Sequence, residues 1–97
     1  MMLTIEMPDE MVMYAGDIHK FVDLMIHKLH KNMHKGRWDN MSVIGAFNEL
    51  NHEVDELIDA IRSNDTNEIY LESADVANFA MIIASITRER GVDNGTD

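Results

Sequence analysis

Glutamates recur in the middle of this chain at the spacing of helical turns. Glu49, Glu53 and Glu56 are four and three residues apart, so on an α-helix, at about 100° per residue, they project from one stripe. An acidic stripe alone is more often a solvated face than a site. The stripe indicates a binding site only if a second set of carboxylates, further along the chain, lies close to it.

Glu72 and Asp75 form that second set, and they fall inside an apolar stripe. A helical wheel groups them with Val76, Phe79, Ile82, Ile83 and Ile86. Both carboxylates are therefore expected to point toward the core. Burying an ionised carboxylate without a partner is costly, and two at this spacing repel each other.

Cations that would neutralise these carboxylates are not evident in the sequence. Arg62, Arg88 and Arg90 lie near helix ends, so a salt-bridge explanation lacks its positive charges. Oxygen-only ligands suit Mg²⁺ or Mn²⁺. We therefore expect the two carboxylate pairs to face each other across antiparallel helices and to bind such an ion.

Three helices are needed to position these groups. Apolar residues at spacings of three and four predict helices over about 9–33, 42–62 and 66–90, and no segment has the pattern of a strand. Asp65 with Glu68 makes a capping box for the third helix. The sequence predicts an all-α protein, an antiparallel bundle of about three helices.

Length and composition bound the function. The 97 residues form one domain, 1–97, whose small core is expected to be completed by self-association, while residues 92–97 fray. A net charge of −10 argues against a nucleic-acid polymer as partner. The absence of cysteine fits a reducing cytoplasm, and with neither a leader pattern nor a run of about 20 apolar residues we expect no membrane span.

Glu53-x-x-Glu56 and Glu72-x-x-Asp75 resemble the E-x-x-E and E-x-x-D metal motif of the MazG-like all-α nucleoside triphosphate pyrophosphohydrolases, a group that includes the dimeric dUTPases. The residues that follow the two motifs, 57–61 and 76–80, also resemble the family's sequence. Residues 35–38 resemble a segment found in short, often phage-borne members. The chain departs from the pattern at His52, where the family often has Glu.

The resemblance implies a magnesium-dependent hydrolase that converts a (d)NTP and water to a (d)NMP and pyrophosphate. The metal-activated water attacks the α-phosphorus in such enzymes. The implied metal ligands and catalytic residues are Glu53, Glu56, Glu72 and Asp75. The resemblance also implies a homodimer or homotetramer in the cytoplasm, that of the host if the chain is phage-encoded. It favours a purine dNTP, with a dUTPase-like pyrimidine dNTP hydrolase as the alternative.

Four further residues are candidates for substrate binding. Lys35 and Arg37 lie in the break after the first helix, either to reach the β- and γ-phosphates or as ordinary surface charges. Trp38 stacks on a base or anchors the loop. Asn78, one turn beyond Asp75, bonds to a ligand, a phosphate or another helix.

Two interpretations compete with the hydrolase. One is an acidic helical interaction module, in which the carboxylates solubilise the chain or bond across a subunit interface. The other is a zinc store or sensor built on His27, His30 and His34. The lysines interleaved with these histidines are more typical of a solvated or phosphate-facing surface.

Overall fold

A computed structural model describes residues 1–92, except for the side chain of His34. The elements are, in order, a short 3-10 helix η1 (Asp9–Met11), α1 (Val12–Asn32), a second 3-10 helix η2 (Met33–Lys35), α2 (Val43–Arg62) and α3 (Thr66–Arg90). The described residues contain no strand, so the all-helical class is confirmed. The predicted frayed tail, residues 92–97, lies outside the described part of the chain except for Val92.

Local side-chain chemistry sets the starts of α2 and α3. The Ser42 hydroxyl accepts a hydrogen bond from the Gly45 N–H at 3.0 Å, and the Asp65 carboxylate accepts one from the Glu68 N–H at 3.1 Å. The N–H of Asp65 itself donates to the Ala60 carbonyl, so only one half of the predicted capping box forms. Each cap satisfies an N–H that the helix leaves without an internal partner.

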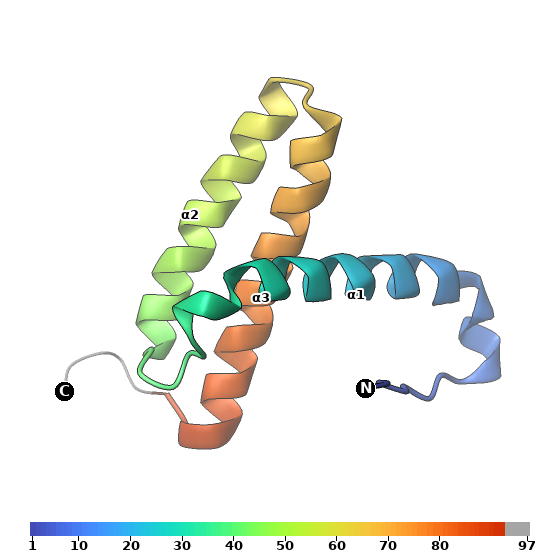
Figure 1. The fold of residues 1–97 in the computed structure, drawn as a ribbon, viewed down its shortest axis with the longest axis horizontal. Coiled ribbons are helices and arrows are strands. Elements are labelled where there is room, and N and C mark those ends of the chain that lie inside the picture. Colours follow the sequence, from blue (N-terminus) through green and yellow to red (C-terminus); the bar gives the residue numbers. More distant parts are fainter. Residues whose placement is uncertain (93–97) are drawn as a thin grey trace.

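Two of the three main helices form a hairpin, and the other helix crosses it. α2 and α3 run antiparallel and side by side, whereas α1 crosses α3 and its N-terminal half extends beyond the hairpin (Figure 1). Residues 36–42 redirect the chain between α1 and α2, beginning at Gly36, whose φ of +84° favours glycine. The expected bundle is therefore only partly formed within one chain.

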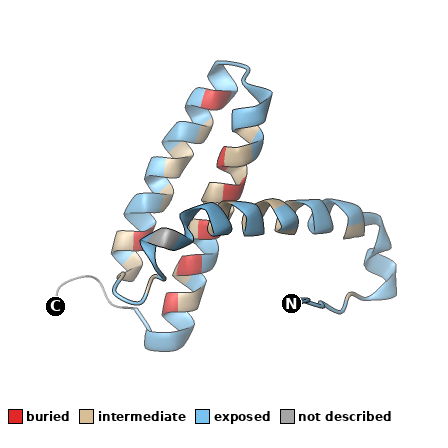
Figure 2. Ribbon diagram, in the orientation of Figure 1, coloured by how far each residue is buried: buried red, intermediate tan, exposed pale blue. Residues whose placement is uncertain are grey.

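The core between α2 and α3 is small. Its buried apolar side chains are Ala46, Ala60, Ala74, Ile82 and Ile86. The alanines let the two helices approach closely, and the buried positions lie on the facing sides of the hairpin (Figure 2). α1 contributes no fully buried residue.

An open shape accompanies this small core. The radius of gyration is 15.2 Å, above the roughly 12–13 Å expected for a compact chain of this length. The part of α1 beyond the hairpin exposes several apolar side chains, Val12, Met13, Tyr14 and Ile18 among them. A surface of this kind is typical of an interface, and it favours the predicted self-association.

α3 also meets the length and composition of a membrane-crossing helix. The central helix of a soluble protein meets the same two measures, so they do not separate the possibilities. Glu72 and Asp75 lie within α3, where a bilayer would make their charges costly. The absence of a membrane span stays a prediction.

Candidate functional site

A pocket of about 790 Å³ is bounded by all three main helices and by the segment that follows α1. Carboxylates, cations and apolar side chains share its lining. The acidic residues are Glu49, Glu53, Glu56, Glu72 and Asp75; the basic ones are Lys28, Lys35 and Arg37; the larger apolar ones include Leu29, Trp38, Met41, Phe79 and Ile82. All eight site residues expected from the sequence therefore line one pocket.

Three of the four expected metal ligands converge. Glu53 and Glu56 occupy successive turns of α2, and Glu72 faces them from α3; their carboxylate oxygens lie within 4.8 Å of one another. Glu72 is only 9% exposed. The three-and-four spacing predicted this meeting because each pair lies on one helical face and the two helices are antiparallel neighbours.

The electrostatics of this glutamate cluster disfavour full ionisation. Burial raises the pKa of Glu53 to about 8, and the nearby carboxylates of Glu72, Asp75 and Glu56 add to the rise. Burial likewise raises the pKa of Glu72. Close carboxylates in a partly dry site each favour a neutral neighbour.

Two oxygens of the cluster are suited to bind a cation. The Oε2 atoms of Glu53 and Glu72 are buried and make no hydrogen bond within the described structure, which is costly for a polar atom. Oxygens bound to one Mg²⁺ at about 2.1 Å are at most about 4.2 Å apart. Side-chain adjustments of well under an ångström per residue would bring Glu53, Glu56 and Glu72 to that spacing, so their donor set fits a divalent ion.

Asp75 has a different partner. Its Oδ2 lies 3.2 Å from Nζ of Lys28 on α1, and both side chains are largely buried. The expectation that these carboxylates lack a cation is therefore wrong for Asp75. The cation comes from a distant helix, which crosses α3 at this point. Lys28 follows Met25 by one turn on the apolar stripe of α1, and a lysine in such a stripe is the signal that could have revealed it.

Asn78 provides a second contact between α1 and α3. Its Nδ2 donates to the Met25 carbonyl at 3.1 Å, which is the helix-to-helix bond among the alternatives for this residue. Its Oδ1 is buried and has no hydrogen-bond partner in the described structure, and Asn78 lines the pocket. Asp75–Lys28 and Asn78–Met25 thus fasten α1 to α3 at two points one helical turn apart.

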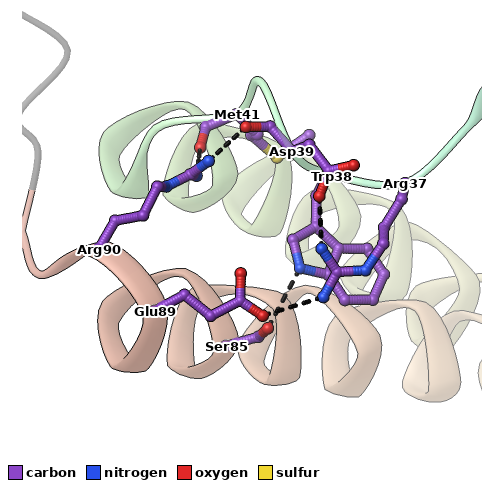
Figure 3. Close-up of polar contacts among 7 residues, drawn as sticks. All are labelled: Arg37, Trp38, Asp39, Met41, Ser85, Glu89 and Arg90. Carbon is purple, nitrogen blue, oxygen red and sulfur yellow. Dashed lines mark hydrogen bonds and ion pairs between the residues drawn. The ribbon is translucent and has the colours of Figure 1, made fainter.

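A polar network ties the loop before α2 to the end of α3 (Figure 3). The Arg37 guanidinium bonds to Asp39 and, at 3.1 Å, to Glu89, and it stacks 4.6 Å from the centre of the Trp38 ring. The Trp38 indole N–H donates to Ser85 at 3.2 Å. The Arg37 and Trp38 side chains thus anchor the loop beside the pocket.

Arg90 completes this network and was not foreseen from the sequence. Its guanidinium donates to the carbonyls of Asp39 and Met41. The sequence placed Arg90 only near a helix end. Lys35 is exposed and, like Arg37 and Trp38, lines the pocket.

The histidines of α1 and α2 have different surroundings. His52, where the resembled family often has Glu, lies with Nε2 at 3.2 Å from Oε1 of Glu56. His27 and His30 are exposed on α1, and the cluster of potential metal ligands found among the described side chains contains no histidine. The side chain of His34 is outside the described structure, so the zinc interpretation draws no support from the other two.

Comparison with known proteins adds no relative to this picture. No protein-family model, curated protein or solved structure matches the chain.

Proposed function

We propose that this protein is a divalent-metal-dependent nucleoside triphosphate pyrophosphohydrolase. The observation that carries the proposal is the convergence of Glu53, Glu56 and Glu72 from two helices, with buried oxygens that lack partners. The described structure gives those two oxygens no salt bridge and no hydrogen-bond partner, and the alternative to a cation is a proton that Glu53 and Glu72 share. A cation site accounts for them.

Glu53, Glu56 and Glu72 would hold the ion, which is Mg²⁺ with Mn²⁺ as a substitute. When bound, such an ion activates water and neutralises phosphate oxygens. Glu49 is exposed at the same pocket, where its carboxylate is available to accept a proton from water. The chemistry needs the three glutamates ionised, and cation binding favours that form against the raised pKa values of Glu53 and Glu72.

The rest of the pocket supports a nucleotide as substrate. Its volume of about 790 Å³ falls within the usual range of small-molecule sites. Lys28 and Lys35 place positive charge in the lining for the phosphates, while Phe79 and Trp38 offer an apolar wall for the base. Water attack at the α-phosphorus would release pyrophosphate, with the purine deoxynucleotide kept as the favoured substrate over a pyrimidine one.

Self-association belongs to the same proposal. The exposed apolar part of α1 and the small core of the hairpin are explained if a second copy packs against them as a homodimer or as part of a homotetramer. Burying these side chains would add the apolar contact that one chain lacks.

The direct experiment incubates the protein with the common NTPs and dNTPs and Mg²⁺ or Mn²⁺, and resolves monophosphate from diphosphate products. We expect equal amounts of monophosphate and pyrophosphate, lost in Glu56→Gln and Glu72→Gln. Asp55→Asn is the matched control, because this substitution also removes one negative charge from α2. Asp55 is exposed and lies outside the pocket lining. Absence of turnover on every nucleotide, together with no thermal stabilisation by metal, would favour the acidic interaction module instead.

A further inference from the structure

Lys28 places a fixed positive charge inside the carboxylate pocket. Its Nζ lies 3.2 Å from Oδ2 of Asp75, with side-chain exposures of 14% and 15%. Asp75 is not part of the cluster formed by the three glutamates. Outside that cluster the pocket lining holds two more carboxylates, Glu49, which is exposed, and Asp75, which is largely buried. Asp75 is therefore the better placed of the two to bind a second divalent ion, and Lys28 already occupies it.

Displacing Lys28 from Asp75 is unfavourable for two reasons. An ammonium with so little exposure would lose its partner while remaining mostly buried, which is the costly way to break such a pair. Its helix is also held in place, because Asn78 donates to the carbonyl of Met25, one turn away on α1. Lys28 therefore cannot leave with α1 unless this second contact breaks as well.

The ammonium of Lys28 retains donors for a ligand. A lysine carries three N–H donors, and Asp75 is the partner that the structure gives it. Lys28 also lines the pocket that holds the glutamate cluster. Arg37 is less suited to this role, since Asp39 and Glu89 already engage its guanidinium.

We propose that Lys28 is the resident cation of this pocket: the site takes a single divalent ion, on Glu53, Glu56 and Glu72, and Lys28, held by Asp75, supplies the second positive charge to the triphosphate oxygens. The proposal rests on the proposed function and specifies its metal count and one phosphate contact. Asp75 then acts as the positioning residue of Lys28 rather than as a metal ligand.

The first test counts bound Mn²⁺ per chain by equilibrium dialysis with electron paramagnetic resonance. We expect one ion in the wild type, one in Asp75→Asn, none in Glu72→Gln, and a rise toward two in Lys28→Met, where Asp75 is freed. Lys20→Met is the matched control, because Lys20 is an exposed lysine of α1 outside the pocket lining, and it should bind one ion.

Four outcomes would overturn the inference. Two ions in an active wild type would refute the proposed role of Lys28 but not the proposed function. The same holds if Asp75→Asn folds but loses the ion, or if Lys28→Met still binds only one. A wild type that binds no Mn²⁺ would refute the proposed function together with this inference.

A second test uses the wild type and does not depend on how the variants fold. Lysine acylation followed by mass spectrometry compares Lys28 with the exposed Lys20 in the same sample. Mn²⁺ alone should leave the modification of Lys28 unchanged, and Mn²⁺ with a non-hydrolysable triphosphate analogue should protect it. A rise in Lys28 modification on adding Mn²⁺ would show that the ion displaces it from Asp75, and no protection by the analogue would refute the phosphate contact.

Discussion

Replacing Glu53 by Gln should stabilise the metal-free protein at alkaline pH while abolishing its response to metal. Burial first, and then the neighbouring carboxylates, raise the pKa of Glu53 from 4.5 to about 8. Gln has nearly the shape of the protonated carboxyl but cannot ionise. The variant therefore keeps the form that the folded chain prefers at every pH.

The pH window follows from the two pKa values. Below about pH 4.5 the carboxyl is protonated in both the folded and the unfolded chain, so its contribution to stability is fully present. Between there and about pH 8 the unfolded chain binds fewer protons than the folded one, so the wild type loses stability as pH rises. Above about pH 8 the loss is complete.

The size of the effect is bounded by the pKa change. At about 1.36 kcal/mol per pKa unit, the change caps the loss at about 5 kcal/mol. Glu53 is partly exposed, so solvent screening reduces the expected value to about 1–2 kcal/mol. For a domain of this size that corresponds to about 5–15 °C in Tm.

Thermal unfolding followed by circular dichroism, in chelator and at fixed protein concentration, measures this difference at pH 4, 6 and 8.5. Glu53→Gln should match the wild type at pH 4 and exceed it at pH 8.5. Glu49→Gln is the control, since Glu49 is exposed and one turn away on α2, and it should change stability by less than about 0.5 kcal/mol. With Mg²⁺ at about 100 times its Kd, the wild type should gain about 2.7 kcal/mol and Glu53→Gln nothing. A Glu53→Gln variant less stable than the wild type at pH 8.5 would refute the reasoning and make Glu53 a structural acceptor.

Four further outcomes are expected. Asp75→Asn should destabilise the fold by about 1–3 kcal/mol in chemical denaturation, because it leaves the ammonium of Lys28 mostly buried and unpaired; an unchanged midpoint would mean that the pair contributes nothing. Lys35→Ala should raise KM for triphosphates without altering the products, and a change in products would show that this residue directs the attack. Hydrolysis in oxygen-18 water should label the monophosphate, whereas label in orthophosphate would place the attack at the terminal phosphorus. Light scattering should show a dimer or larger species, against a single 11.1 kDa chain if the exposed face of α1 has no partner copy.

Much of the architecture was readable in the sequence because it depends on local spacing. Apolar residues at intervals of three and four gave the helices, and Asp65 marked the start of α3 through a cap whose hydrogen bond the structure contains. The same spacing placed Glu53 and Glu56 on one face and Glu72 within a buried stripe. These features need only the geometry of a helix and the pairing of two helices joined by a short turn.

The tertiary structure decided which charges meet. Lys28 and Asp75 are far apart in the chain, and their contact depends on where α1 crosses α3. The loop after α1 is itself tied to the end of α3 by side-chain and carbonyl contacts of Arg37 and Arg90. A single sequence shows the faces of each helix but not the angle at which two faces pack, because that angle minimises the energy of many contacts between distant segments. The sequence by itself therefore determined the helices and the three converging glutamates, and only the packed structure could supply the lysine that neutralises the fourth carboxylate.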